Sequence, residues 1–556
     1  MRLALLAGLV LGLSTVVTAQ DAPETPWVKE LKDVHIPMRD GKWLAANVLL
    51  PEQRGKYPCI VVQTPYNKDR MGREYGDNTS EAGRGSEKAF SMFDRQHYAY
   101  CFVDWRGFYG SKAATNARGT RGYKRGQDGY DCVEWCAKQE WCDGKIGTWG
   151  GSALGKQQFD TAAEQPPHLV CAAPLIAYQG NRYEAYFENG VQLKAQVDAL
   201  DRLGFGVGEA VRGAPAIADK PIWRLLRNQS YTPEKITVPC LMVSGWWDNY
   251  PRDVIEQFND LLAKGGAETR KHSRLVMGPW SHTQIDVAKQ GDLEFKDAEG
   301  YSTRITLKFF DYFLRDQKDN GFDKLPRVHA FQCNGAWVTA ESWDKLLGKP
   351  TTFWPYADNL IHSQKILQAP EGPAPLGEFT YDPRNPGPSI GGQNLPPLTH
   401  GPKDVSEIEK RKDVMLYATA ALEAPLAIRG EAVLKLMVCS DRKDFDLHVR
   451  LVDTDASGKS FLVGEAIQRA KYRDGKTEQL LEPGKFVELT LRFVPTAYTF
   501  AKGHKLKLIL TGGSDPRYER NSNTGTDGWD AATAQPVTVR MDHSGPKMTL
   551  ELPVVE

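Results

Sequence analysis

The sequence predicts an α/β fold in its N-terminal part, with a mostly parallel sheet covered by helices on both faces, and an all-β domain at the C-terminus. Up to Leu314, short apolar runs rich in β-forming residues alternate with amphipathic helical stretches. From Leu325 onward the helical periodicity nearly vanishes, and short alternating runs separated by Gly, Pro, Asp and Asn take its place. The 556 residues are enough for about three domains.

The N-terminus carries the pattern of an export signal. Arg2 supplies a positive charge, residues 3–17 form an apolar stretch, and Val17-Thr18-Ala19 places small residues where a signal peptidase cleaves. The stretch is shorter than the roughly 18 to 20 apolar residues of a membrane span, and no other segment reaches that length. We therefore expect a signal peptide over residues 1–19, cleavage near Ala19, and a mature chain without a membrane span in the periplasm or outside the cell. The alternative is a buried N-terminal helix.

The elements of the α/β part follow one another in alternation. Residues 33–51 predict a hairpin with a turn at Arg39-Asp40-Gly41. Strands and helices then alternate, as expected for parallel strands whose connections cross the faces of the sheet. The predicted strands are Cys59–Thr64, Tyr98–Asp104, His168–Pro174, Pro239–Gly245 and Arg274–Gly278, and the predicted helices are Gln127–Gln139, Pro251–Leu262 and Arg304–Leu314.

The C-terminal part has the strand pattern of a β-sandwich. A Pro/Gly-rich stretch, Gln368–Pro402, is expected to be an ordered extended excursion or a long loop. The predicted strands of this part are Ala432–Cys439, Asp446–Val452, Lys485–Phe493, Lys505–Leu510 and Val537–Leu552.

Charge and cysteine content exclude several classes of function. Lys+Arg and Asp+Glu both number 70 and no basic run occurs, so we expect no nucleic-acid partner. No C-x-x-C pair exists and the histidines do not cluster at ligand spacing, so we expect no metal site. Five of the nine cysteines lie in apolar, strand-like runs, where free thiols are usually buried. Cys136 and Cys142 lie close together, and the sequence leaves open whether they form a disulfide or stay free.

A serine at a predicted strand-to-helix turn is the strongest chemical signal. An apolar strand from Lys145 leads into Gly150-Gly151-Ser152, and a helical pattern follows from Gly155. Small residues around such a turn let the serine hydroxyl project into a cleft, as in the nucleophile elbow of α/β-hydrolases. The backbone N–H of Ala153 would then face a developing oxyanion from the N-terminus of a helix. The spacing G-x-S-x-x-G is one residue longer than the common form, and the competing interpretation is an ordinary Gly/Ser turn.

A carboxylate and an imidazole follow the serine in the chain order of that fold, Ser, then Asp, then His. The strand predicted over 239–245 is followed by Trp246-Trp247-Asp248, and the strand over 274–278 by Pro279-Trp280-Ser281-His282. Ligand sites in open parallel sheets lie at the carboxyl ends of the strands, so the three side chains would meet there. We expect Ser152 to be the nucleophile, His282 the general base and Asp248 the orienting acid. The alternative is that Asp248 forms a turn and His282 lies in a surface loop.

With these motifs the sequence resembles the cocaine esterase, X-Pro dipeptidyl-peptidase and α-amino-acid ester hydrolase superfamily, from about Val34 to the C-terminus. Gly150-Gly-Ser152, Ser244-Gly-Trp-Trp-Asp248 and Gly278-Pro-Trp-Ser-His282 resemble its nucleophile, acid and histidine motifs. Further matching segments are Thr64-Pro-Tyr66, Asp104-Trp-Arg-Gly-Phe-Tyr-Gly-Ser111, Glu134-Trp135, Gln139-Glu-Trp-Cys-Asp-Gly144, Asp444-Phe-Asp446, Gly503-His504 and Asp515-Pro-Arg-Tyr-Glu-Arg-Asn521.

The resemblance implies an α/β-hydrolase fold with a short helical cap insertion and a C-terminal β jelly roll. The implied division is α/β-hydrolase over 20–177 and 236–324, cap over 178–235, and jelly roll over 325–556. It also implies that the phenol of Tyr66 joins the N–H of Ala153 in the oxyanion hole, and that the reaction needs no cofactor. Glu134-Trp135, Arg106 and His504 are expected to be structural.

Departures from the family pattern bear on the substrate. Many relatives carry an aromatic residue after the nucleophile, whereas this chain has Ala153 and a short cap, which together imply an open pocket. The α-amino-acid ester hydrolases hold a substrate ammonium with acidic residues directly after the triad aspartate. This chain has Asn249 and Tyr250 there, so an ammonium would lack charge-assisted partners.

We therefore expect an exported serine hydrolase that cleaves small-molecule carboxylic esters through an acyl-enzyme. Alternatives within the class are an acylase or an X-Pro dipeptidyl-peptidase-type hydrolase, both acting on amides. Alternatives outside it are a jelly roll that binds carbohydrate and directs the enzyme to a polymer, and an inactive relative that only binds. The substrate depends on the loop Asn67–Arg95, the cap and the jelly-roll contact, and the sequence leaves open whether the chain forms a homo-oligomer.

Overall fold

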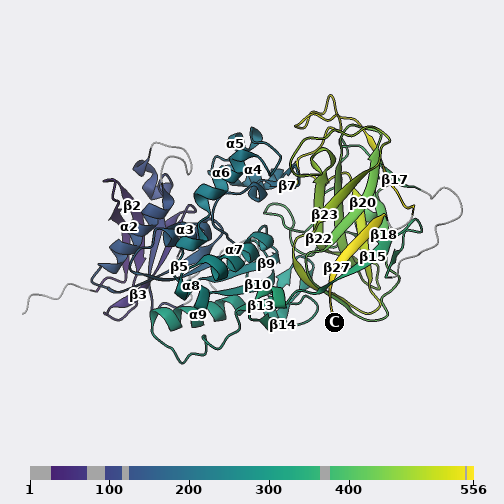
Figure 1. Ribbon diagram of the computed structural model, residues 1–556. Helices are drawn as coiled ribbons and strands as arrows, with labels where there is room; N and C mark the ends of the chain where they lie inside the picture. The colour runs from purple at the N-terminus through teal and green to yellow at the C-terminus, as the bar shows by residue number, and fades with distance from the viewer. Residues whose placement is uncertain (1–26, 72–93, 116–123, 364–375, 545–546) are drawn as a thin grey trace, which may run out of the picture.

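The computed structural model describes residues 27–71, 94–115, 124–363, 376–544 and 547–556. Within these residues an α/β domain, a helical insertion and a C-terminal β domain lie beside one another (Figure 1). The predicted signal peptide, residues 1–19, lies outside the described residues, as does most of the loop Asn67–Arg95.

The α/β domain is built on one ten-stranded sheet, and every strand predicted for this part is present. The N-terminal hairpin pairs antiparallel, and the strands from β4 to β13 in the sheet order run parallel. The strands, in sheet order, are β1 (Glu30–Pro37), β2 (Trp43–Leu49), β4 (Ala99–Asp104), β3 (Tyr57–Thr64), β5 (Cys142–Gly151), β6 (Leu169–Leu175), β9 (Leu241–Trp247), β10 (Arg274–Ser281), β13 (Val328–Phe331) and β14 (Trp337–Ala340).

Helices cover both faces of this sheet, as the alternation of side chains along β5 demonstrates. The hydroxyl of Thr148 donates to Gln158 of α3, 3.2 Å away, on one face. The neighbouring Gly147 faces Phe310 and Leu314 of α9 on the other, because successive residues of a strand point to opposite sides. The helices of this domain are α2 (Arg125–Ala137), α3 (Ala153–Ala163), α7 (Pro251–Lys264), α8 (Ala267–His272) and α9 (Tyr301–Leu314).

The helical insertion leaves the sheet after β6 and returns at β9, over residues 176–240, where the sequence predicts a cap over 178–235. It has its own small apolar core, formed by Tyr183, Phe187, Val197, Val211 and Trp223. Its elements are β7 (Phe187–Glu188), β8 (Val191–Gln192), α4 (Lys194–Arg202), α5 (Gly208–Arg212) and α6 (Pro221–Ser230).

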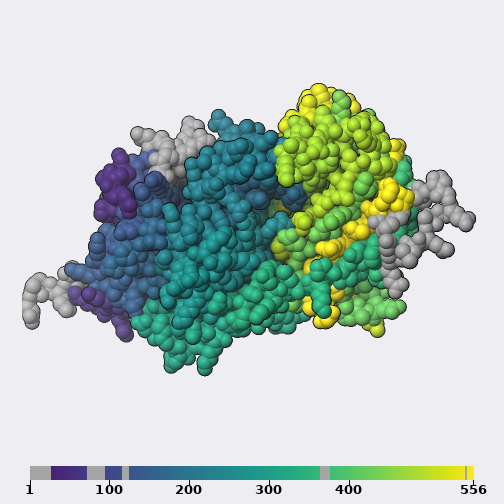
Figure 2. All heavy atoms as spheres, in the orientation of Figure 1, coloured from purple at the N-terminus to yellow at the C-terminus, as the bar shows by residue number. Residues whose placement is uncertain are grey.

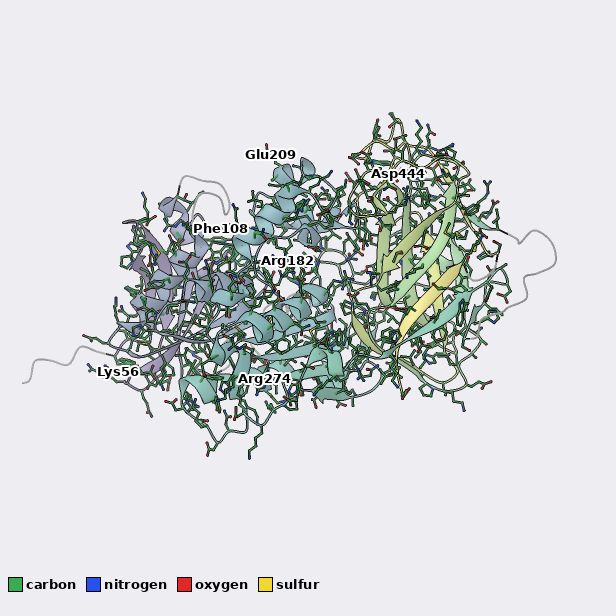
Figure 3. All side chains as sticks on the ribbon, in the orientation of Figure 1. Lys56, Phe108, Arg182, Glu209, Arg274 and Asp444 are labelled. Carbon is green, nitrogen blue, oxygen red and sulfur yellow. The ribbon has the colours of Figure 1, made fainter. Side chains whose placement is uncertain are left out.

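A buried arginine joins the insertion to the α/β domain. Figure 3 labels Arg182 between the two parts, and its guanidinium donates to Glu256 at 2.7 Å and to Asp253 at 3.3 Å, both on α7. Burial raises the pKa of Asp253 to about 6, against the opposing effect of Arg182. Removing the arginine would leave a buried acid without its cation, so the ion pairs of Arg182 hold the insertion over α7.

The C-terminal domain consists of two antiparallel sheets with a jelly-roll arrangement. The larger sheet contains β15 (Lys349–Pro355), β16 (Ile361–His362), β17 (Gly377–Tyr381), β19 (Leu426–Gly430), β20 (Val433–Ser440), β23 (Val487–Arg492), β24 (Thr496–Phe500), β26 (Val537–Met541) and β27 (Met548–Val555). The smaller sheet contains β18 (Met415–Ala418), β21 (Asp446–Thr454), β22 (Ser460–Arg469) and β25 (Lys505–Thr511).

Two details of the C-terminal part differ from the sequence prediction. β13 and β14 lie beyond residue 325, but β13 pairs parallel with β10, so the α/β sheet continues past the predicted start of the jelly roll. Short strands of either domain have the same period of two, which is why the pattern did not separate them. The single strand predicted over Val537–Leu552 is two strands, β26 and β27, which flank β20.

All nine cysteines are free and buried. The thiol of Cys136 interacts with those of Cys59 and Cys101, at the packing of α2 against β3 and β4, and it is not bonded to Cys142. Burial raises the pKa of Cys136 well above its ordinary value, so the thiol is a protonated packing group. Of the two alternatives that the sequence left open, the structure has the unpaired one.

Candidate active site

Ser152 stands at a sharp turn between β5 and α3. Its backbone is in the left-handed half of conformational space, with φ 57° and ψ −119°. A non-glycine residue held there is strained, and such strain persists only where the surrounding structure imposes it. Gly155 lets α3 start this close to the sheet, since a Cβ atom at this position would lie 2.5 Å from the Cβ of Ala177. The last glycine of the G-x-S-x-x-G segment thus has a packing role.

The structure brings Ser152, His282 and Asp248 into one hydrogen-bonded chain. Nε2 of His282 lies 3.0 Å from Oγ of Ser152, and Nδ1 lies 2.6 Å from Oδ1 of Asp248. Each side chain comes from the carboxyl end of a parallel strand, respectively β5, β10 and β9. This geometry lets the serine pass its proton to an imidazole that a carboxylate orients.

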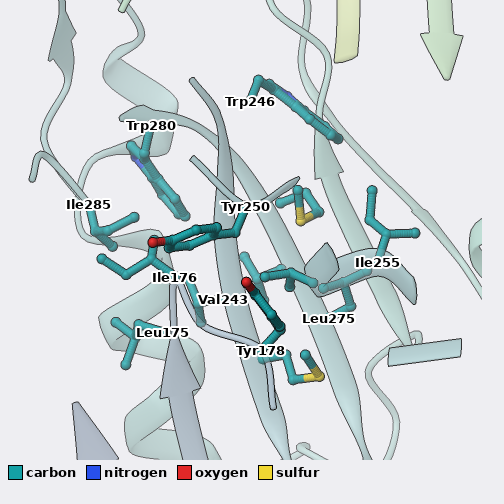
Figure 4. Packing of buried hydrophobic residues seen from close by; sticks show 14 of the residues in the cluster. Leu175, Ile176, Tyr178, Val243, Trp246, Tyr250, Ile255, Leu275, Trp280 and Ile285 are labelled. Atoms are coloured by element: carbon teal, nitrogen blue, oxygen red, sulfur yellow. The ribbon is translucent and has the colours of Figure 1, made fainter. Parts of the chain in front are cut away.

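The carboxylate of Asp248 is fully buried and held from both sides. Oδ2 accepts a hydrogen bond from the hydroxyl of Ser244 at 2.7 Å, and Oδ1 accepts one from the N–H of Asn249 at 2.6 Å. Tyr250 packs edge-on against the ring of His282, with centroids 5.7 Å apart. Figure 4 shows Tyr250 and Ile176 among the buried apolar side chains of the core. The acid and the imidazole therefore have one orientation each.

Two hydrogen-bond donors lie beside the serine hydroxyl. Tyr66 follows β3, and its phenol forms a side-chain hydrogen bond with Ser152. Burial raises the pKa of Tyr66 to about 12, with this hydrogen bond acting in the opposite direction, so the phenol stays protonated and can donate. Ala153 is the first residue of α3, where backbone N–H groups lack acceptors inside the helix. The two donors come from separate elements that meet at Ser152.

A cavity of about 320 Å³ opens in front of the serine. Ser152, His282 and Tyr66 line this cavity, and the remaining lining is largely apolar. Among the described lining residues, Arg202 at the end of α4 is the one with a full charge, and none is acidic. The walls come from the sheet side, the insertion and the C-terminal domain, through Ile176, Ala199, Leu200, Leu203, Tyr250, Leu395 and Pro396.

The polar residues that the sequence assigned to structural roles have structural partners. Arg106 forms ion pairs with Asp128 and Asp40 at 2.6 and 2.7 Å. Glu134 accepts from the N–H of His168 and contacts its ring at 2.9 Å, and His504 contacts Asp453 at 2.9 Å. Among the described residues, no group of three or more His, Cys, Asp or Glu side chains could hold a metal ion. No described helix is long and apolar enough to cross a membrane.

Sequence reasoning named the cap and the jelly-roll contact as determinants of the substrate, but it did not identify the residues that form these two outer walls of the pocket. Leu395 and Pro396 belong to the stretch predicted only as a Pro/Gly-rich excursion, and Ala199 and Leu200 lie on α4 in the insertion. The apolar spacing of α4 was the available signal for a wall, but it does not tell which cavity an apolar face borders.

Two protein-family models match the chain, one in its α/β part and one in its C-terminal part. A model of the X-Pro dipeptidyl-peptidase (S15 family) matches residues 40–221 and 214–284, and one of the X-Pro dipeptidyl-peptidase C-terminal non-catalytic domain matches residues 320–552. Cocaine esterase from Rhodococcus sp. (strain MB1 Bresler) is 26% identical over 553 residues, which cover 89% of this chain and 92% of that protein.

Two solved structures share the fold over nearly the whole chain. An α-amino acid ester hydrolase has a TM-score of 0.78 and 22% identity, covering 97% of this chain and 100% of its own. An aminopeptidase from the marine sediment archaeon Thaumarchaeota archaeon has a TM-score of 0.77 and 20% identity, covering 97% of this chain and 99% of its own. Both domains and their order are therefore common to these proteins.

Proposed function

We propose that this chain, a serine hydrolase of the cocaine esterase, X-Pro dipeptidyl-peptidase and α-amino-acid ester hydrolase superfamily, cleaves carboxylic esters through an acyl-enzyme on Ser152. The observation that carries the proposal is the chain of hydrogen bonds from Ser152 through His282 to Asp248, at 3.0 and 2.6 Å. A serine hydroxyl is a weak nucleophile until an adjacent base accepts its proton, and this arrangement provides the base.

The proposed reaction has two acyl-transfer steps. Nε2 of His282 accepts the proton of Ser152 as Oγ attacks the ester carbonyl, and Asp248 stabilises the imidazolium that forms. The carbonyl oxygen becomes an oxyanion, which accepts hydrogen bonds from the phenol of Tyr66 and the N–H of Ala153. The imidazolium then protonates the departing alcohol. Water enters, His282 takes its proton, and attack on the acyl-enzyme releases the acid and restores Ser152.

The lining of the pocket favours neutral or carboxylate-bearing acyl groups over acyl groups with an ammonium. No described lining residue is acidic, and Arg202 adds a positive charge at the wall. Asn249, which follows Asp248, donates its side-chain amide to Gln196 at 2.7 Å. An ammonium would lose its hydration here without gaining an anion in return. This argues against X-Pro dipeptidyl-peptidase activity, whose substrates carry a free ammonium. We place esters ahead of acylase amides because an alkoxide leaves more easily than an amine, which makes acylation easier.

Labelling with a fluorophosphonate probe tests the nucleophile. The probe phosphonylates an activated serine, and mass spectrometry of the labelled peptide identifies the residue. We expect label on Ser152 in the wild type and in Ser457→Ala, which changes an exposed turn serine, and none in Ser152→Ala. A folded wild type without label would contradict the proposal. The values of kcat/KM for p-nitrophenyl esters with neutral, carboxylate-bearing and ammonium-bearing acyl groups then show which kind of acyl group the enzyme prefers.

Export is part of the proposal. Arg2, the apolar residues 3–17 and the small residues up to Ala19 support it. N-terminal sequencing of the chain recovered from fractionated cells should give a first residue near Gln20. A full-length chain recovered from the cytoplasm would contradict export and leave the chemistry unaffected.

A further inference from the structure

The motif Asp515–Asn521 lies where the insertion meets the C-terminal domain, although its residues do not line the pocket. Figures 1 and 2 show the insertion against the C-terminal domain at this side of the molecule. Arg517 and Tyr518 are buried, with 7% and 2% of their surfaces exposed. Burying a guanidinium is costly, so its contacts must compensate for the lost hydration.

The first set of contacts holds the insertion. The carbonyl of Arg517 accepts the N–H of Ala195 at 3.2 Å, at the start of α4. The phenol of Tyr518 donates to Glu188 at 2.8 Å, and the N–H of Glu519 donates to the carbonyl of Gln192 at 3.0 Å. The first of these bonds holds the first turn of α4, and the other two hold the short strands β7 and β8 that precede it. The same helix carries the pocket residues Ala199, Leu200 and Arg202.

The second set holds the opposite wall. The guanidinium of Arg517 donates through Nη1 to the carbonyl of Gln393 and, at 3.3 Å, to the side-chain oxygen of Asn394. The next two residues, Leu395 and Pro396, line the pocket. Glu465 of β22 lies 3.4 Å from Nε of Arg517 and supplies the compensating charge. One residue thus contacts both outer walls, α4 through its backbone and the 393–396 loop through its side chain.

We propose that Arg517 is a positioning residue that sets the gap between α4 and the 393–396 loop, and thereby the size of acyl group that the pocket accepts. The proposal rests on the proposed esterase function. Arg517 does not contact the reacting atoms, so its effect should be on the fit of large acyl groups rather than on the activation of Ser152. A displacement of about 1 Å at a wall can change the rate for a fitted substrate on the order of a hundredfold.

The test compares Arg517→Lys with a matched variant of the same segment. Lysine keeps a positive charge beside Glu465, but its single ammonium cannot engage Gln393, Asn394 and Glu465 with the geometry of a guanidinium. Arg520 pairs with Asp515 at 2.8 Å and contacts neither wall, so Arg520→Lys is the control. Tyr518→Phe removes the bond of the phenol to Glu188 and its interaction with the side chain of Arg517, and it provides the second measurement if Arg517→Lys does not fold.

The readouts are kcat and KM for p-nitrophenyl acetate and octanoate, and the rate of labelling by a small fluorophosphonate. We expect Arg517→Lys to change the octanoate-to-acetate ratio of kcat/KM by about tenfold or more, mainly through KM, while the labelling rate stays within about threefold. Arg520→Lys should leave the ratio unchanged. An unchanged ratio in folded Arg517→Lys, or in Tyr518→Phe where the first does not fold, would overturn the positioning role. A wild type that neither labels nor hydrolyses either ester would overturn the proposed function and this inference together.

Discussion

Replacing Tyr66 by Phe removes one of the two donors proposed for the oxyanion hole and keeps the ring that packs beside Ser152. The phenol forms a hydrogen bond with the Ser152 hydroxyl, and burial raises its pKa to about 12. The N–H of Ala153 remains in the variant. Loss of one such donor costs about 10²- to 10³-fold in kcat, or about 2.7 to 4 kcal/mol of transition-state stabilisation. We expect a loss of that size with KM changed by less than about threefold.

The pKa also predicts how this defect varies with pH. A phenol with a pKa of about 12 is protonated throughout a neutral assay range, so Tyr66 donates at every pH tested. The ratio of wild-type to variant kcat should therefore stay constant between about pH 6 and pH 9. This ratio is measured by the hydrolysis of a p-nitrophenyl ester at each pH, with the absorbance corrected for the ionisation of p-nitrophenol.

Tyr178→Phe is the matched control for this experiment. Its hydroxyl is buried and has no hydrogen-bond partner among the described residues, so its removal should leave kcat nearly unchanged. Thermal unfolding of both variants checks that they are folded. A loss below about tenfold in Tyr66→Phe, or a loss confined to KM, would refute the role of the phenol in the oxyanion hole.

Three further predictions concern the acid, the pocket and the β domain. Asp248→Asn should keep the fold but favour the wrong imidazole tautomer, lowering kcat about 10⁴-fold; a loss below about a hundredfold would contradict the assignment. Arg202→Glu should lower kcat/KM for carboxylate-bearing esters relative to neutral ones, and less so at high salt; equal effects on both would exclude the charge contact. Burial, helped by Arg450, lowers the pKa of His448 from 6.5 to about 4, so the folded state binds fewer protons than the unfolded state between these values. The free energy of unfolding should therefore fall as the pH drops through that window, and denaturant titrations should find a shallower fall in His448→Gln.

The parts of the site that lie on regular strands could be predicted from the sequence. Ser152, Asp248 and His282 each follow an apolar run, and parallel strands align their carboxyl ends at one edge, so local patterns were enough to bring them together. Tyr66 depended on the family resemblance, because nothing in the chemistry of an isolated tyrosine after a strand separates an oxyanion donor from a packed ring.

The outer pocket could not be predicted in the same way. Its walls are the helix α4 and the 393–396 loop, whose meeting depends on contacts between residues more than a hundred positions apart, such as Arg517 with Gln393. The sheet to which β13 belongs could not be predicted for a related reason, because β13 is assigned to its sheet by its partner β10 and not by its own pattern. Sequence periodicity reports the exposure of a residue along its own element, but it does not report which distant element covers it.

The nine buried thiols have a consequence for how the chain reaches its native state. Each is reduced in the folded protein, and their burial protects them from oxidants once folding is complete. A chain that unfolds or is translocated into an oxidising compartment exposes all nine, and any bridge formed then is absent from the native structure. If the chain is exported as proposed, folding must therefore outpace thiol oxidation. Recombinant production of a chain without residues 1–19 in a reducing cytoplasm should accordingly give a higher yield of active protein than secretion into an oxidising medium.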